Sequence, residues 1–185
     1  GLSADERTAG LLERVLGPDF PTGGYILGKS GIRQAYLTGR GSVTMRAKAE
    51  IEKRKGDKEA IVVTEIPYQV NKARVIEKIA ELLQDKKLPF LDDINDESTT
   101  DIRLVLTPKS RTIDPTHLME QLFRQTDLET RFSLNMNVLI DGRTPKVCGL
   151  REVLRAFLDH RREVLIRRSR HRMEKIDHRL EVLEG

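Results

Sequence analysis

Apolar and polar residues alternate from 43 to 52, which is the period of a half-buried β-strand. The β-branched run from 60 to 66 predicts a second strand, and the charged turn between them indicates a hairpin. Pro67 has no N–H to donate to a neighbouring strand, so the second strand ends there. Asn71 then predicts the N-cap of a helix over 72–87, which carries an apolar stripe.

Strands and helices continue to alternate up to residue 148. Further helices are predicted over 3–15 and 30–37 and from Pro115 onward, and further strands over 25–27, 102–107 and 132–140. Pairs of strands therefore lie between helices, which favours a mixed or antiparallel sheet over a doubly wound parallel one. The predicted fold class is α+β, with the helices packed on one face of the sheet.

From residue 150 a single helical period takes over. No Gly or Pro interrupts 150–184, so the predicted helix would extend over roughly 50 Å. Between 161 and 172, six arginines face one glutamate. Such a helix is not stable by propensity alone and needs a partner along its apolar seam, for which we expect a returning helix beyond Gly185. We therefore interpret the long helix as the beginning of a coiled coil.

The overall charge is only mildly basic. The 185 residues include 33 Lys and Arg and 29 Asp and Glu, a net charge of +4 with a pI near 9.3, so a nucleic-acid site requires local clustering. One cluster lies in 29–56, where two Glu accompany Lys29, Arg33, Arg40, Arg46, Lys48, Lys53, Arg54 and Lys55. On a sheet these residues would form a basic surface suited to a phosphate backbone, and the glycines among them would allow close backbone approach. A solvated strand face is the alternative, and charge alone slightly favours it. Aromatic residues make up only 4% of the chain, which argues against base stacking.

Catalytic and metal-binding chemistry is sparse in the sequence. The single cysteine, Cys148, excludes an intrachain disulfide and a zinc cluster, and it fits a reducing cytosol. His171 and His178 share a helix face, but no carboxylate is spaced to complete a metal triad with them. Motifs for phosphate loops, hydrolases and zinc proteases are absent. The acidic stretch 92–101 lacks the spacing of a calcium loop, so a polar turn is the favoured interpretation. No membrane span or signal peptide is predicted, and a first residue other than Met indicates a piece of a longer protein.

Three motifs are specific enough to name a family. They are Gly-Pro-Asp-Phe-Pro-Thr-Gly-Gly at 17–24, Gly-Arg-Gly-Ser-Val…Met-Arg-Ala at 39–47, and Glu-Ile-Pro-Tyr-Gln-Val-Asn-Lys-Ala-Arg at 65–74. In this order they resemble the A subunit of bacterial type IIA DNA topoisomerases, and the resemblance covers essentially the whole chain. Within that family, residues 86–98, 126–129 and 141–145 resemble topoisomerase IV more than gyrase.

The resemblance implies a place for the chain in that subunit. Residues 1–28 would connect from a winged-helix domain, 29–148 would form the tower domain, and 149–185 would be the first arm of the coiled coil. The catalytic tyrosine would lie in the winged-helix domain upstream, so we assign no catalytic residue. ATP and Mg²⁺ would belong to the B subunit, and no cofactor or metal is expected in this chain. The expected partners, in the cytoplasm and with no membrane involved, are duplex DNA, the B subunit, and another A subunit.

A domain similar to the tower of this family would grip the backbone of a bent duplex, which reverses the preference from charge alone. The helix over 30–37 begins beside Lys29, and its exposed N–H groups can seat a phosphate. The expected phosphate contacts, which position DNA without reading its bases, are Lys29, Arg33, Arg40, Ser42, Arg46 and Lys72. Two alternatives stay open: a gyrase A subunit, and a structural module that braces the dimer without touching DNA.

Overall fold

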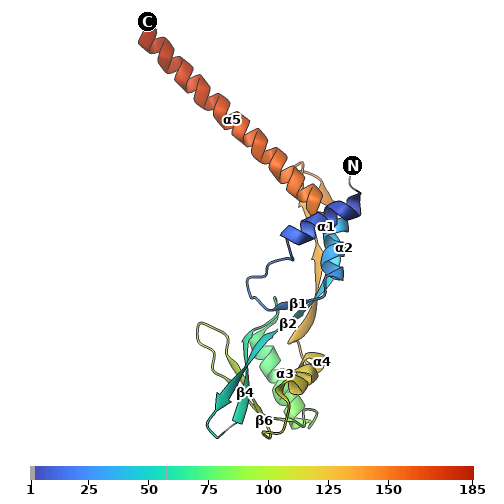
Figure 1. Ribbon diagram of the computed structural model, residues 1–185. Coiled ribbons are helices and arrows are strands. Elements are labelled where there is room, and N and C mark those ends of the chain that lie inside the picture. Colours follow the sequence, from blue (N-terminus) through green and yellow to red (C-terminus); the bar gives the residue numbers. More distant parts are fainter. Residues whose placement is uncertain (1–2, 57) are drawn as a thin grey trace. The chain divides into compact units, whose positions relative to one another are not determined.

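The computed structural model describes residues 3–56 and 58–185 (Figure 1). The elements found there are α1 (Ala4–Arg14), β1 (Tyr25–Leu27), α2 (Ser30–Thr38), β2 (Arg40–Arg46), β3 (Lys48–Arg54), β4 (Lys58–Glu65), α3 (Lys72–Gln84), β5 (Leu91–Asp96), β6 (Leu104–Pro108), α4 (Pro115–Gln125), β7 (Glu129–Asn135), β8 (Asn137–Leu139), β9 (Pro145–Val147) and α5 (Leu150–Glu184). The chain divides into two compact units. Unit 2 comprises 17–32 and 42–133, and unit 1 comprises the described residues up to 16 together with 33–41 and 134–185.

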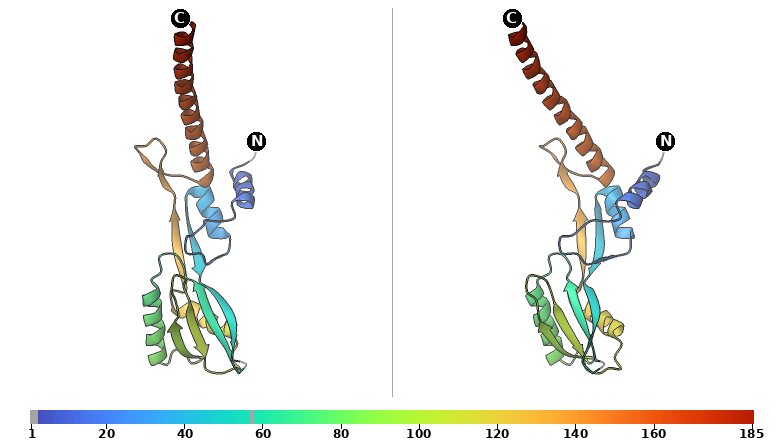
Figure 2. Two further views of the ribbon diagram at one scale, coloured as in Figure 1. Left: turned by 90° about the vertical axis from the view of Figure 1, so that its left-hand side faces the viewer. Right: turned by 60° about the vertical axis from the view of Figure 1, so that its left-hand side comes forward.

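Unit 2 is built on an antiparallel sheet in the order β3-β4-β6-β5. Figure 2 shows these strands side by side, with α3 running along them. The register places Ile61 of β4 opposite Leu106 of β6, and Leu106 opposite Ile94 of β5. Because side chains alternate between the two faces of a strand, these three residues share one face of the sheet.

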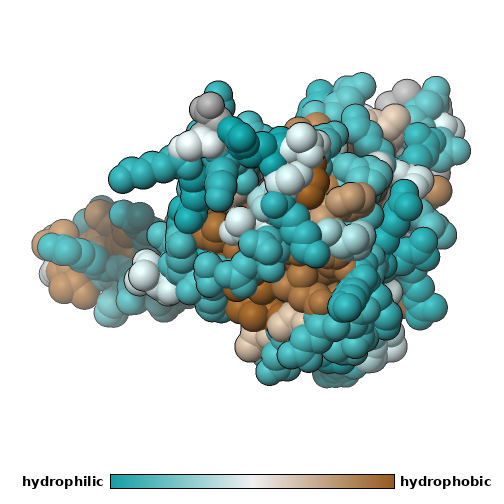
Figure 3. Space-filling model, turned by 90° about the horizontal axis from the view of Figure 1, so that it is seen from below, coloured by the Kyte–Doolittle hydropathy of each residue, from teal (hydrophilic) through white to brown (hydrophobic). Residues whose placement is uncertain are grey.

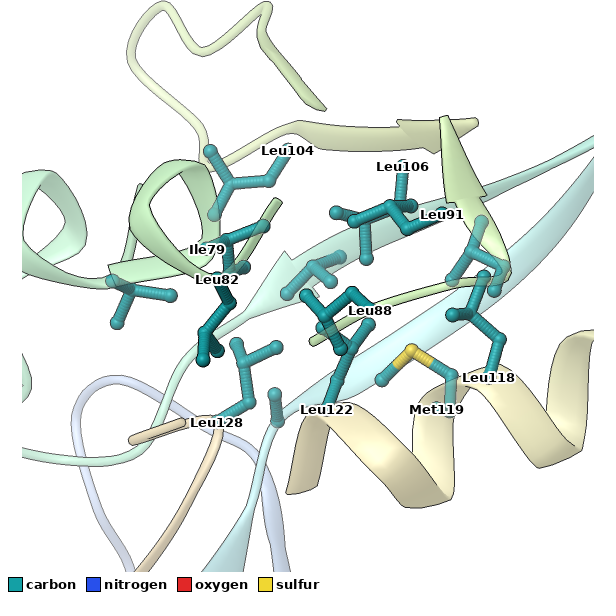
Figure 4. Close-up of a cluster of buried hydrophobic side chains, with 14 of the residues drawn as sticks. Ile79, Leu82, Leu88, Leu91, Leu104, Leu106, Leu118, Met119, Leu122 and Leu128 are labelled. Atoms are coloured by element: carbon teal, nitrogen blue, oxygen red, sulfur yellow. The ribbon is translucent and has the colours of Figure 1, made fainter. Parts of the chain in front are cut away.

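Both helices of unit 2 pack on that face. The shared core contains Ile79 and Leu82 of α3 and Leu118, Met119 and Leu122 of α4. Figure 4 shows these side chains converging on leucines of β6 between the two helices. The helices begin where the sequence places their caps: the side chains of Asn71 and Asp114 accept hydrogen bonds from backbone N–H groups in the first turns of α3 and α4.

The opposite face of the sheet holds a small apolar row beneath charged side chains. Ala60, Val62 and Val105 are buried and form a cluster of their own. Beside this row, Arg103 donates two hydrogen bonds of 2.7 Å each to the carboxylate of Glu52, and its Nε donates to Glu97 at 3.0 Å. These bonds raise the pKa of the Arg103 guanidinium and tie its charge to two carboxylates of the same unit.

Unit 1 contains α1, the β8–β9 hairpin and α5. A capping box opens α1, because Ser3 and Glu6 exchange side-chain and backbone hydrogen bonds. Gly39 has a positive φ of +82°, and a Cβ there would lie 2.5 Å from the carbonyl oxygen of Cys148. No residue of α5 is buried.

The predicted α+β class, with helices on one face of a sheet and a long C-terminal helix, is confirmed. Two local predictions are wrong. The single strand over 43–52 is two strands in different sheets, because the chain changes partner at buried Ala47, whose N–H donates to the carbonyl of Leu128. The acidic stretch 92–101 does not begin as a turn. Its first residues belong to the edge strand Leu91–Asp96, which pairs with β6.

Charged residues dominate the surface. Figure 3 shows mostly hydrophilic residues on the face that it draws, with apolar residues gathered at its centre and more of them at the left. Among the residues that the structure describes, no helix is both long and apolar enough to span a bilayer.

The core of unit 2 gives the first prediction. Replacing Leu122 by Ala leaves a cavity in a fully buried site, so the free energy of unfolding should fall by about 2–5 kcal/mol in urea denaturation. The matched control is Ile51→Ala on β3, which is 54% exposed and should cost under about 1 kcal/mol. Equal losses in the two variants would contradict this assignment of the core.

Candidate nucleic-acid interface

The start of α2 lies against the backbone of β2. A Cβ on Gly31 would overlap the carbonyl oxygen of Ser42, so only glycine allows this approach. Lys29 precedes the helix and is exposed, and Ser42 of β2 also has an exposed side. An ammonium group cannot accept a hydrogen bond, so Lys29 cannot cap the first N–H groups of α2, and no acidic residue lies in that first turn. The structure therefore brings Lys29, Ser42 and the first turn of α2, which has no acidic residue, into one region that suits an anion.

Arg40 opens β2 with an exposed side chain. Its backbone is fixed by Thr38, whose hydroxyl donates to the Arg40 carbonyl at 2.9 Å and accepts from the Arg40 N–H at 3.2 Å. Val43 and Met45 of the same strand are buried, whereas Arg40 and Ser42 are exposed. Within residues 3–56 and 58–185, neither Lys29 nor Arg40 forms an ion pair, and both cations are available to a phosphate.

Arg46 is engaged inside unit 2, contrary to the expectation that it lies on an open basic face. Its Nε donates to Glu129, its Nη1 donates to Glu120 at 2.9 Å, and its guanidinium lies 4.5 Å from the ring centre of Phe123. These carboxylates, Glu129 first, raise the pKa of Arg46. A guanidinium held by two acids and an aromatic ring is a structural group, so we remove Arg46 from the set of proposed phosphate contacts.

Two further predicted contacts also have acidic partners. Lys72 Nζ lies 2.7 Å from Asp96, and this bond is the main reason why the pKa of Asp96 is lowered to about 2. Arg33 lies 3.2 Å from Asp5, but both side chains are at least half exposed. Exposed pairs of this kind are weak and exchange readily, so Arg33 stays available whereas Lys72 is largely committed.

The loop 17–24, which leads from α1 toward β1, is held by a hydrogen bond and by ring packing. The Gly24 N–H donates to the carboxylate of Glu65 at 2.5 Å, and a Cβ on Gly23 would overlap that same carboxylate. The Phe20 ring packs against the rings of Tyr68 and Phe132, with centroids 5.4 and 5.2 Å away. Two of the family-specific motifs, 17–24 and 65–74, are thus one packed assembly that fixes the entry to β1.

Groups for catalysis or metal binding do not converge in the described part of the chain. No three His, Cys, Asp or Glu residues there are placed to hold a metal ion. The Cys148 thiol is buried, and burial raises its pKa, which makes it a poor nucleophile. Exposed cations and the backbone N–H groups at the start of a helix are groups that proteins use to hold an anion.

Comparison with known proteins identifies the family. The family model for the A subunit of DNA gyrase/topoisomerase IV matches residues 2–185. The A subunit of DNA topoisomerase 4 from Caulobacter vibrioides is 53% identical over 182 residues, which is 98% of this chain and 24% of that protein. Its counterpart from Rickettsia bellii is 52% identical over 176 residues, 95% of this chain and 24% of that protein. The A subunit of DNA gyrase from Staphylococcus epidermidis is 49% identical over 177 residues, 95% of this chain and 20% of that protein.

The chain belongs to the family of DNA gyrase and topoisomerase IV A subunits. It spans about a quarter of the length of the topoisomerase relatives and a fifth of the gyrase relative. The resemblance inferred from the three motifs is confirmed.

Sequence reasoning found the cations of this topoisomerase-family chain but missed the acids that engage them. Glu120 and Glu129 lie 74 and 83 residues from Arg46, and no local pattern links them. It also left out three exposed lysines around the β3–β4 turn from the expected contacts, namely Lys53, Lys55 and Lys58. Their clustering around a charged turn could have placed them among the expected contacts. They add exposed positive charge to unit 2.

The Lys72–Asp96 pair predicts a pH dependence. The folded-state pKa of Asp96 lies below its ordinary value of 3.8, so the pair stabilises the chain above that pH and its contribution is lost as pH falls toward 2. Followed by NMR, the Asp96 carboxyl should titrate with a midpoint of about 2, and Lys72→Met should raise that midpoint toward 3.8. The control Lys78→Met removes an exposed pair with Glu81 and should leave the midpoint unchanged. An unshifted midpoint in Lys72→Met would rule the pair out.

The geometry of the loop 17–24 predicts that Gly23 does not tolerate a side chain. Gly23 has φ +68°, so Gly23→Ala is strained and also pushes against Glu65; it should lower the free energy of unfolding by about 1–3 kcal/mol. Gly10→Ala is the matched control, because nothing lies within 4 Å of its Cβ position in α1. In a helix this change should be neutral or stabilise by up to about 1 kcal/mol. Urea denaturation measures both, and a neutral Gly23→Ala would be incompatible with the loop geometry.

Proposed function

We propose that the chain is part of the DNA-cleaving and rejoining subunit of an ATP-dependent type II topoisomerase, and that it holds the backbone of a DNA duplex. Family membership supports the reaction class. We favour topoisomerase IV, which decatenates and relaxes DNA, over gyrase. The slightly higher identity to the topoisomerase 4 relatives and the motifs at 86–98, 126–129 and 141–145 support that choice.

The DNA-holding role is carried by exposed cations that have no acidic partner in the segments that the structure describes, of which Lys29 stands beside the first turn of α2. Lys29 of unit 2 and Arg40 of unit 1 have no acidic partners among the described residues, and Ser42 offers a hydroxyl beside the first turn of α2. Cations, a hydroxyl and helix N–H groups are the donors that proteins use toward phosphate oxygens. Such contacts position a duplex and are indifferent to its sequence.

The remaining parts of the proposal follow from the family. The boundaries 1–28, 29–148 and 149–185 correspond to a connector, a tower domain and the first arm of a coiled coil, in which α5 pairs with another helix. The catalytic tyrosine would be supplied outside this chain, and ATP and Mg²⁺ by the B subunit. The working assembly would contain two A subunits in the cytoplasm, and this chain alone would be inactive.

A bracing role without DNA contact is the second candidate function. The engagement of Arg46 and Lys72 by acids favours it, because both cations were expected at the DNA and instead stabilise unit 2. A gyrase A subunit is the alternative assignment of the parent enzyme.

The salt dependence of DNA binding separates these functions. In the intact protein, Lys29→Gln combined with Arg40→Gln should weaken binding to duplexes of any sequence, because two phosphate contacts are lost. The slope of log K against log salt concentration should become shallower by about 2. Titrations of labelled duplexes between low and moderate salt provide the measurement.

Lys109→Gln with Arg124→Gln is the matched control, since it removes two cations of unit 2 that lie outside α2 and β2. Its slope should equal that of the unchanged protein. If the Lys29/Arg40 variant also keeps the full slope, the bracing role replaces DNA holding.

A further inference from the structure

Unit 2 has a groove beside one edge of its four-stranded sheet. The groove has a volume of about 310 Å³, and its lining includes Ala49 and Ile51 of β3, Met119 and Phe123 of α4, and Leu27 of β1. All of these residues belong to unit 2. Ile51 is 54% exposed and Leu27 is 41% exposed, so the groove leaves apolar side chains in contact with water.

Strand β3 forms that edge of the sheet. It pairs with β4 on one side, and no strand among the described residues pairs with its other side. Backbone N–H and C=O groups along an unpaired side can pair with a further strand. Ile51 lies opposite Ile61 of β4, which belongs to the core, so Ile51 is on the face of the sheet that bears the helices. A strand added to β3 would therefore lie beside the groove and could fill it with alternate side chains.

The other edge strand of the sheet, β5, is less suited to pairing. Three of its six residues are aspartates, and charged side chains on an edge strand oppose the addition of another strand. Its apolar residue Ile94 already packs against the core. On β3 the charges are of both signs, and Ile51 is exposed. Of the two edges, β3 is the one that combines unpaired backbone groups with an apolar groove.

One charged group at the groove is available to a partner. The charged residues in the lining are Arg46 and Glu50. Arg46 is held by Glu120 and Glu129, whereas the Glu50 carboxylate is exposed and forms no ion pair or hydrogen bond within the described part of the chain. Glu50 precedes Ile51, so it lies on the opposite face of β3. Because opposite charges on neighbouring strands stabilise pairing, a strand with a Lys or Arg on this face would suit β3 best.

A second copy of β3 is a poor match for this edge. When two β3 strands pair antiparallel, Ile51 of each copy stays on the apolar side only in registers that differ by two residues. The three registers nearest the centre of the strand place Glu50 opposite Glu50, Glu50 opposite Glu52, or Glu52 opposite Glu52. Like charges directly opposite each other destabilise strand pairing. The charge pattern therefore favours a different chain.

We propose that the unpaired edge of β3 and its groove bind an extended segment of another protein, which adds a strand to the sheet. The segment places apolar side chains at alternate positions beside Ile51 and a Lys or Arg on its other face near Glu50. Backbone hydrogen bonds supply the affinity, and the groove and Glu50 supply the specificity, as is usual when a peptide adds to a sheet edge.

Two other kinds of partner fit the edge less well. A helix would fill the groove but leave the edge N–H and C=O groups of β3 unpaired. A nucleic acid would bring its phosphates to the Glu50 carboxylate. The inference goes beyond the proposed function and is independent of it, because neither Lys29 nor Arg40 lines the groove.

A synthetic peptide tests the proposal, and seven residues match the length of β3. The probe is Thr-Val-Lys-Val-Thr-Val-Thr with fluorescein at its amino end, which as a strand presents valines on one face and the lysine on the other. Added to the intact protein, it should give a saturable rise in fluorescence anisotropy. A peptide of the same composition with adjacent valines, Thr-Thr-Val-Val-Val-Thr-Lys, should bind about tenfold more weakly because its apolar residues do not share a face.

Methylation of the peptide nitrogens tests the strand pairing itself. The N–H groups of successive residues in a strand point to opposite sides, so only every second one faces β3. Methylating the valine nitrogens and methylating the other nitrogens should therefore differ in effect. One set should weaken binding about tenfold or more, because the hydrogen bonds to β3 are lost, and the other set should keep most of the affinity.

Substitutions in the intact protein locate the site. Ile51→Ala should weaken binding of the probe about tenfold through the lost apolar contact, and it should hardly affect folding because Ile51 is exposed. Glu50→Lys should weaken binding about fivefold, and a probe with Glu in place of its Lys should recover that loss. The matched control is Asp93→Lys, which reverses an exposed carboxylate on β5 and should leave the affinity unchanged.

Several results would overturn the proposal. They are an absence of probe binding, equal binding of the rearranged peptide, equal effects of the two methylation sets, and equal losses in Glu50→Lys and Asp93→Lys. Self-association in sedimentation velocity that Ile51→Ala abolishes would assign the edge to a second copy and overturn it as well. The salt slope of the Lys29/Arg40 variant is independent of all these outcomes, so the DNA-holding role stands or fails separately.

Discussion

Ion pairing within the chain decides which cations stay free to meet a phosphate. Arg46, Lys72 and Arg103 are each held by carboxylates that are distant in sequence or in another strand, and they stabilise unit 2. Lys29 and Arg40 have no such partner among the described residues. A count of basic residues treats paired and unpaired cations alike. A cation that already pairs with a carboxylate would have to break that ion pair before it could bind a phosphate, and this costs free energy. The proposed interface, limited to cations without an acidic partner, is therefore smaller than the charge pattern suggests.

Three glycines, two in the basic region 29–56 and one in the loop before it, allow close approaches. The sequence indicates that they permit close approach of a backbone to another group, and in the structure that group belongs to the chain itself. Gly31 admits the backbone of β2 at Ser42, Gly39 admits that of Cys148, and Gly23 admits the carboxylate of Glu65. These approaches position the start of α2, the start of β2 and the entry to β1. The glycines therefore contribute to the proposed interface only indirectly, by positioning the elements that carry the unpaired cations.

Local chemistry explains which features could be predicted from the sequence. The caps at Asn71 and Asp114 and the apolar stripes of α3 and α4 involve residues a few positions apart, and these features are visible in the sequence. The change from one sheet to another at Ala47 is not visible in the sequence, because apolar and polar residues go on alternating through it. Only the hydrogen bond from the Ala47 N–H to the Leu128 carbonyl shows that the strand ends there. The partners of Arg46 lie beyond any local window for the same reason. Prediction thus succeeded where hydrogen bonds are local and failed where a distant carbonyl or carboxylate decides.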